Sequence, residues 1–317
     1  MPEPLTHFYA NGALLVMWGA LVFHYILPIP YQAHPVRLWR SFALILSDKV
    51  NSNHSYQQSI VSGGMAWLLM IFPTWLLLWA LKPLVWQPQL FDLALLLIAL
   101  GWRNNEILGK KLIRYLSQEN KAKARQALEP FLNRETAPLS QLGLGKAGAE
   151  TLLIGFSRNV IGVLFWYGLL GAQGALLYRL NAELARVWSP SRKDYQPFGL
   201  PVVRVQAMLD YLPLRLFALF IAIGGNTART LSMMREQGKS WPTPGPGWLI
   251  AAVGNKFALS LGGPAIYNTI KSVRPKIGGR IAPAAFHLAQ IQHLMAWRAC
   301  VWLLLQSLIM AAVYQGF

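Results

Sequence analysis

The chain has 317 residues and a formal net charge of +17, yet only 13% of its residues are charged and 54% are hydrophobic. A soluble domain carries about 25% charged residues, so this composition excludes an ordinary soluble enzyme and favours a chain built from membrane helices. Nucleic-acid binding is not expected, because no zinc-finger spacing or RNA-binding aromatic signature accompanies the positive charge, which collects in the cytoplasmic loops of membrane proteins.

Six apolar segments predict an all-α, polytopic membrane helix bundle of about six spans, with cytoplasmic helical loops. The segments run from Gly12 to Leu27, Gly63 to Leu81, Leu90 to Gly101, Val160 to Tyr178, Leu212 to Gly225 and Trp297 to Val313. A bilayer core takes about 20 helical residues to cross, so the fifth segment permits a re-entrant turn as well as a span. The start, MPEPLTHFYANG, lacks the basic region of a cleavable signal peptide, so the first segment is expected to remain as a membrane helix.

Lys and Arg between the segments predict the orientation. The links at about 28–62, 102–151 and 226–296 contain three, nine and eight of them, whereas the alternate links contain Lys82 alone and five over 179–211. The positive-inside rule therefore predicts that the first, third and fifth links, at about 28–62, 102–151 and 226–296, are cytoplasmic and that both termini lie outside. We expect a single integral membrane domain over 1–317, multi-pass in a bacterial inner membrane and in contact with its lipids.

The links carry their own predicted structure. Apolar residues recur near helical spacing from Asn104 to Leu132, which predicts helices there. SWPTPGPGW at 240–248 has three prolines and two glycines and is predicted to be a fixed loop rather than a helix. GLGKAG at 143–148 lacks the spacing and the final hydroxyl of a Walker A motif and predicts a glycine-rich turn.

No metal site is predicted from the titratable side chains. His287 and His293 lie six apart, which is poor spacing for two ligands on one helical face. The single cysteine, Cys300, excludes a disulfide within the chain and a metal site built of cysteines. The 12 acids include no close pair, and Asp92 alone is expected inside a span.

Four arginines and two aromatic residues are candidate binding groups. Arg37, Arg134, Arg204 and Arg215 lie near a Pro or Asn at a predicted membrane surface, where guanidinium groups suit phosphates and carboxylates or anchor lipid headgroups. Trp248 and Tyr267 each end a Gly/Pro segment and can stack on a flat ring, although such segments can equally be buried re-entrant turns.

Six fragments in this order resemble the CbiB-type cobalamin-biosynthesis membrane proteins, the adenosylcobinamide-phosphate synthases, over most of the chain. They are AHPVR at 33–37, KARQALEPFLNRETAPLS at 123–140, AET at 149–151, VRVQAMLDYLPLRL at 203–216, PGPGW at 244–248 and LSLGGPAIY at 259–267. The family couples an aminopropanol-type amine to a carboxylate of adenosylcobyric acid, using ATP and Mg²⁺.

The resemblance implies a set of site residues. It implies that Glu150 and Glu135 are catalytic. It implies that substrate contacts come from His34, Arg37, Arg134, Thr136, Thr151, Arg204, Arg215, Trp248 and Tyr267. ATP and Mg²⁺ are implied as co-reactants if the synthase activity is retained.

The chain departs from the family at its acidic and amide positions. Glu135 replaces an Asp, and Arg158 replaces an Asp with the opposite charge. The other departures are Ile154, Gly155, Ala182, Glu183, Leu184, Ala185, Gln206, Ala207, Gly245 and Ile250. Losing one coordinating or supporting residue commonly costs roughly 10–100-fold in metal affinity or activity, so these changes together predict weakened or lost ligase chemistry.

Four hypotheses follow. The first is a diverged relative that handles a corrinoid or corrinoid precursor at the cytoplasmic face. The second is a working synthase. The third is a membrane sensor similar to the AmpE-type relatives, with a protein partner or as a homodimer. The fourth is a transporter, which the broken loops permit but no inverted repeat supports.

Overall fold

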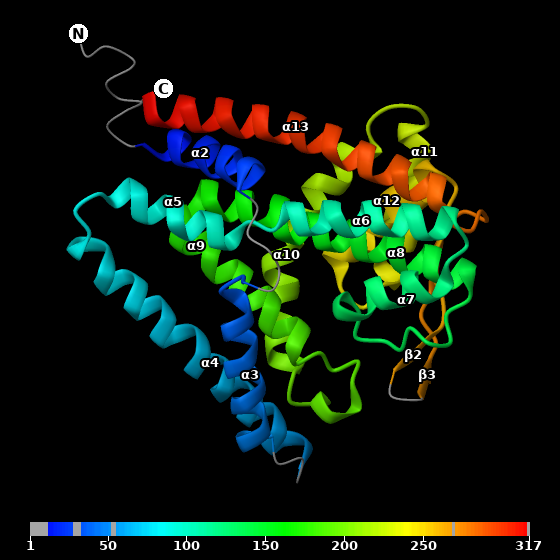
Figure 1. The fold of residues 1–317 in the computed structure, drawn as a ribbon, viewed down its shortest axis with the longest axis horizontal. Helices are drawn as coiled ribbons and strands as arrows, with labels where there is room; N and C mark the ends of the chain where they lie inside the picture. The colour runs from blue at the N-terminus through cyan, green and yellow to red at the C-terminus, as the bar shows by residue number, and fades with distance from the viewer. Residues whose placement is uncertain (1–11, 28–32, 52–54, 268–269, 316–317) are drawn as a thin grey trace.

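The computed structural model describes residues 12–27, 33–51, 55–267 and 270–315, and over these it is an all-α membrane helix bundle, as predicted (Figure 1). The predicted lack of a signal peptide falls largely on residues 1–11, outside the described residues. The helices are α2 (Ala13–Ile26), α3 (Val36–Val50), α4 (Tyr56–Leu81), α5 (Pro88–Ala99), α6 (Trp102–Ser117), α7 (Lys121–Leu128), α8 (Gln141–Phe156), α9 (Val163–Val187), α10 (Leu200–Ala222), α11 (Thr227–Gln237), α12 (Pro244–Lys256) and α13 (Ala285–Gln315). A π-helical segment, η3 (Ser157–Gly162), joins α8 to α9.

In the described chain, four helical stretches are long and apolar enough to cross a membrane: Tyr56–Leu84, Gln141–Val187, Leu200–Ala222 and Ala285–Val313. Two of the six predicted spans are too short as helices, because α2 has 14 residues and α5 has 12 against the ~20 that a bilayer core requires. The predicted fifth segment is instead longer than expected, since α10 has 23 residues and begins at Leu200. In each of α4 and α13, only 17% of the most apolar stretch is buried inside the protein. These two helices therefore present apolar side chains outward.

The predicted fourth span is not one helix but a helical hairpin. Gly171 has φ 67° and ψ −166°, which breaks α9 into two arms. The arms lie side by side, because Arg179 donates to Asn159 and the Tyr178 hydroxyl oxygen lies 2.2 Å from where a Cβ on Gly162 would be. The two ends of the predicted segment Val160–Tyr178 therefore lie at the same end of the hairpin.

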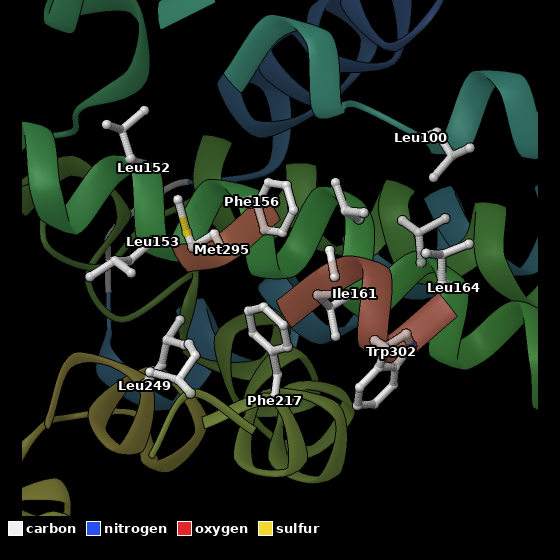
Figure 2. Packing of buried hydrophobic residues seen from close by; sticks show 14 of the residues in the cluster. Leu100, Leu152, Leu153, Phe156, Ile161, Leu164, Phe217, Leu249, Met295 and Trp302 are labelled. Carbon is white, nitrogen blue, oxygen red and sulfur yellow. The ribbon is translucent and has the colours of Figure 1, made fainter. Parts of the chain in front are cut away.

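The core lies where the α8–η3–α9 helix meets α10, α12 and α13, and small residues bring these helices close together. Figure 2 shows this packing with Leu152, Leu153, Phe156, Ile161, Leu164, Phe217, Leu249, Met295 and Trp302. A Cβ on Gly145 of α8 would lie 1.8 Å from the carbonyl oxygen of Pro283, just before α13, and a Cβ on Gly245 of α12 would lie 2.8 Å from the Asp210 carbonyl oxygen of α10. Such close approach between helices favours their association in lipid, where burial of apolar surface contributes little. GLGKAG is thus part of α8, not the predicted turn.

The segment predicted as a fixed Gly/Pro loop also contains the start of a helix. Pro244 is the first residue of α12, a position where its fixed φ suits a helix and its missing N–H is not needed. After α12, two short antiparallel ladders pair β1 (Ser260–Gly262) with β4 (Lys276–Gly278), and β2 (Ala265–Tyr267) with β3 (Ile270–Ser272). Their registers align Leu261 with Ile277 and Ile266 with Lys271.

Candidate functional site

A cavity of about 370 Å³ draws side chains from four of the links between the apolar segments. Arg40 comes from the first link, Arg134 from the link 102–151, Ser189 from 179–211 and Arg274 from 226–296. Asn133 also donates to the Arg186 carbonyl oxygen at 3.3 Å. The link 179–211 therefore lies beside the link 102–151, which contradicts its predicted place on the opposite side of the membrane. The reason is the hairpin at Gly171, which returns the chain to the side it came from.

Glu150, on α8, holds two arginines at one wall of this cavity. One carboxylate oxygen accepts the Gly262 N–H at 2.8 Å, and the other accepts from Arg274 at 3.1 Å and lies 3.5 Å from Arg134 Nη2. Arg274 also donates to the Gly263 carbonyl oxygen and lies over the Trp241 ring at 5.1 Å. Burial lowers the pKa of Arg134, an effect that Glu150 opposes and Arg274 reinforces. We call Arg134, Glu150 and Arg274 the Glu150 cluster.

Glu183, on the second arm of α9, holds two other arginines at the cavity. Arg40 of α3 approaches one oxygen at 2.5 Å and Arg179 approaches the other at 2.7 Å. His34 precedes α3 and accepts the Val36 N–H at 3.3 Å through Nδ1. Burial first, and then the charge of Arg179, lower the His34 pKa to about 4. We call Arg40, Arg179 and Glu183 the Glu183 cluster.

Asp210 is fully buried in the middle of α10 and anchors a third polar group. Its oxygens accept from Arg158 at 2.6 Å, from the Tyr178 hydroxyl at 2.7 Å and from Gln206 at 2.7 Å. Gln206 in turn accepts from Asn181, whose side-chain oxygen accepts from Trp67 of α4. The prediction that Asp92 is the only acid inside a span is wrong, because Asp210 lies within Leu200–Ala222.

Of the residues predicted for the site, the structure brings Arg134, Glu150, Thr151 and Tyr267 together in the cavity. The Thr151 hydroxyl donates to the Ala147 carbonyl oxygen of its own helix. Glu135 and Thr136 line a neighbouring hollow of about 300 Å³, which Arg134 also lines. His34 lies beside the Glu183 cluster rather than in the cavity wall.

The remaining predicted residues lie elsewhere. Arg37 and Arg204 are exposed, on α3 and α10. Arg215 stacks over the rings of Tyr211 at 3.9 Å and Trp248 at 4.7 Å, outside the cavity wall. Trp248 and Arg215 thus contact each other instead of the other candidates.

Sequence reasoning missed several residues that line the cavity. They are Arg40, Asn104, Asn105, Asn159, Arg179, Arg186 and Arg274. A signal existed for one contact, because Arg179 and Glu183 are an i,i+4 pair on a helix. A second signal was Arg158, a charged residue in an apolar helical run, which required a partner that proves to be Asp210. The others come together only through tertiary packing.

The donor set of the cavity suits an anion better than a metal ion. Six arginines line it, at 40, 134, 158, 179, 186 and 274, against the two carboxylates of Glu150 and Glu183. Each carboxylate already lies between two arginines. Within the described residues no group of three or more His, Cys, Asp or Glu side chains lies close enough to hold a metal ion. Guanidinium groups in this number favour a ligand with phosphate or carboxylate oxygens.

Comparison with known proteins gives consistent matches. A family model described as CobD/Cbib protein matches residues 17–296. The chain is 32% identical over 295 residues to a protein of Stutzerimonas stutzeri named cobalamin biosynthesis protein CobD, covering 92% of this chain and 96% of that one. A CobD of Chromobacterium violaceum is 33% identical over 68% of this chain and 69% of its own. A Salmonella arizonae protein named CbiB is 25% identical over 82% and 85%. No solved structure was found to match the chain.

Proposed function

Since the chain belongs to the CobD/CbiB family of cobalamin-biosynthesis proteins, we propose that it holds a corrinoid or corrinoid precursor in the arginine-lined cavity, with amide-ligase chemistry weakened or lost. The names of the relatives indicate cobalamin biosynthesis, and the long apolar helices indicate a membrane location. A corrinoid precursor carries carboxylate and amide groups around its ring. Arginine and asparagine side chains lining a cavity are suited to both groups.

One observation carries this proposal: both carboxylates that line the cavity are already engaged by arginines. Glu150, implied as catalytic by the resemblance, binds two guanidinium groups and the Gly262 N–H. Glu135 is exposed in the neighbouring hollow. A carboxylate whose oxygens are already bound by guanidinium and N–H donors stabilises its neighbours and has little capacity left to bind a metal ion. The cavity therefore favours binding over amide formation.

ATP and Mg²⁺ fit this donor set unequally. Phosphate oxygens match the arginines, and a nucleotide supplies such oxygens when bound. Mg²⁺ is usually held by one or two carboxylates besides phosphate, and among the described residues no carboxylate lining the cavity is left without an arginine. We therefore assign no step of a reaction to the metal.

The second candidate is a working synthase, and the coverage of a relative supports it. The match to the Stutzerimonas stutzeri protein spans 96% of that protein. For either candidate we propose a bacterial inner membrane location with the cavity facing the cytoplasm, because its walls come from the links richest in Lys and Arg.

Two measurements on one preparation test the proposal. The purified chain in detergent is titrated with cobyric acid and cobinamide, following the corrin absorbance, and the same gene is expressed in a strain that lacks its own cobinamide-phosphate synthase. We expect saturable corrinoid binding and little or no restored growth without cobalamin, with the protein in the inner-membrane fraction. Glu150→Ala should weaken binding about tenfold or more, because it releases two arginines, whereas exposed Arg235→Gln should not change it.

The outcomes separate the candidates. Growth restored to the level given by an active synthase, and lost on Glu150→Ala, would establish the working enzyme. Absence of binding by any corrinoid, with a folded protein, would overturn the proposal.

A further inference from the structure

The two guanidinium groups of the Glu150 cluster do not use their full hydrogen-bonding capacity. Nη2 of Arg134 and Nη2 of Arg274 are buried nitrogens that make no hydrogen bond within the described residues, although Arg134 Nη2 lies 3.5 Å from a Glu150 oxygen as an ion pair. Arg134 is 9% exposed, and both residues line the cavity. Leaving a charged donor buried and unsatisfied is costly. Such a pair of donors beside a cavity indicates a bound partner with acceptor oxygens.

The charges of the cluster indicate the sign of that partner. Two guanidinium groups share one carboxylate, so the cluster is left with one positive charge. An oxyanion would neutralise this positive charge, and its oxygens would accept hydrogen bonds from the two Nη2 groups. Charge-assisted bonds of this kind are about twice as strong as neutral ones.

The two arginines are held in place before any ligand arrives. The Glu135 N–H donates to the Ile266 carbonyl oxygen at 3.0 Å, which ties the Arg134 loop to β2. The Gly263 N–H donates to the Pro275 carbonyl oxygen at 3.0 Å, and Arg274 donates back to Gly263. Donors fixed in this way lose little conformational entropy on binding.

Glu150 supports the arginines rather than facing the ligand with a free oxygen. Both of its oxygens have partners, Gly262 N–H on one side and the arginines on the other. It is also 5% exposed. A divalent cation placed here would have to displace a guanidinium group and would meet two like charges.

We propose that Arg134 and Arg274 form an oxyanion subsite that binds a phosphate or carboxylate group of the ligand directly, with Glu150 as a positioning residue and no bridging divalent cation. The subsite rests on the proposed function in so far as that function puts the ligand in this cavity. It adds which atoms of the ligand are recognised and by which donors. Phosphate and carboxylate share the recognition chemistry, and the experiment distinguishes them.

The test is isothermal titration calorimetry on the full chain in detergent, with inorganic pyrophosphate and with glutarate as separate probes. Each titration is made in EDTA and in Mg²⁺. We expect binding in EDTA, at least tenfold weaker in Arg134→Gln and in Arg274→Gln, and within twofold of wild type in Arg235→Gln. Tighter pyrophosphate binding would identify a phosphate-bearing ligand, and tighter glutarate binding a carboxylate-bearing one.

Two further variants protect the test against loss of folding. Arg134→Lys and Arg274→Lys keep the charge beside Glu150 but remove the forked donors, so each should melt near the wild-type temperature and still bind the anion several-fold more weakly. Glutamine variants that bind as well as Arg235→Gln, or binding that disappears in EDTA, would overturn the subsite.

The remaining outcomes separate the subsite from the proposed function. Corrinoid binding without any anion binding would overturn the subsite and leave the proposed function standing. Anion binding that is lost on Arg134→Gln, in a protein that binds no corrinoid, would support the subsite and overturn the proposed function.

Discussion

The Glu150 and Glu183 clusters have the same composition, one carboxylate between two arginines, but they use their donors differently. In the Glu183 cluster both oxygens make short contacts, 2.5 Å to Arg40 and 2.7 Å to Arg179. In the Glu150 cluster the contacts to arginine are 3.1 Å and 3.5 Å, and Nη2 of neither arginine makes a hydrogen bond within the described residues. The first cluster is closed and the second is open.

The difference follows from what each cluster connects. Glu183 joins α9 to Arg40 of α3, and Trp39 of α3 donates to the Leu180 carbonyl oxygen beside it. These contacts fix one helix on another. Glu150 joins α8 to two loops, which can present donors to the cavity without losing the helix packing. Equal composition therefore does not imply equal function: the closed cluster stabilises the fold, and the open cluster is suited to a ligand.

The largest effect is expected when the carboxylate of the closed cluster is removed, which tests whether that cluster stabilises the fold. Glu183→Ala leaves Arg40 and Arg179 close together without their shared anion. Removing one partner of a buried ion pair commonly costs 3–5 kcal/mol, so we expect a loss of about that size in the free energy of unfolding. Equilibrium unfolding in detergent, followed by circular dichroism, measures it.

Exposed Glu129→Ala on the same preparation is the matched control, and its unfolding free energy should change little. A Glu183→Ala protein as stable as Glu129→Ala would show that the closed cluster is not structural.

A second, smaller loss is expected when the buried Asp210 loses its charge. Asp210→Asn leaves Arg158 without its anion and should destabilise the protein by about 2–4 kcal/mol, within the range for breaking buried charged networks. The double variant Asp210→Asn with Arg158→Gln should recover part of the loss, because no uncompensated cation remains.

A double-mutant cycle measures the coupling between these two residues directly. Additive effects of the two substitutions would show that Arg158 gains its stability elsewhere. The pair would then not be the interaction that stabilises Arg158 inside the helix bundle.

Local sequence pattern was sufficient for much of the fold. The all-α membrane class, the helices of the link 102–151 and the apolar segments all follow from periodicity and composition. The predicted turn at GLGKAG and the predicted loop at PGPGW were wrong, because both predictions rested on the low helix propensity of glycine and proline. Glycine and proline are weak helix formers, but close approach to Pro283 by Gly145 and the N1 position of Pro244 make them suitable in α8 and α12.

The site was less accessible from sequence because its contacts join distant residues. Arg158 and Asp210 are 52 residues apart, and Glu150 and Arg274 are 124 apart. The hairpin at Gly171 is what brings Arg179 to Asn159, and a single glycine in an apolar run gives no reason to expect a reversal. Family resemblance found Arg134, Glu150, Thr151 and Tyr267, whereas the arginines that pair with the acids required the tertiary structure.

The smallest expected effect tests the comparison through pH, because His34 adjoins the closed cluster, whereas none of the described residues that line the cavity beside the open cluster is a histidine. His34 has a pKa of about 4 in the folded protein, with Arg179, Glu183, Arg40 and His24 as its charged or titratable neighbours. Its unfolded value is near 6.5. Between these values the unfolded chain binds more protons, so the stability from neutral His34 is complete above pH 6.5 and falls as the pH falls toward 4.

From pH 7.5 to 5.5 this linkage amounts to about 1.4 kcal/mol. His34→Gln removes the titrating group, so its unfolding free energy should fall by about that much less than wild type over the same interval. The measurement is detergent unfolding at the two pH values, with exposed His293→Gln as control because it should follow wild type. Equal falls in wild type and His34→Gln would mean that His34 does not resist protonation, and that the closed cluster leaves it more accessible to water than its burial indicates.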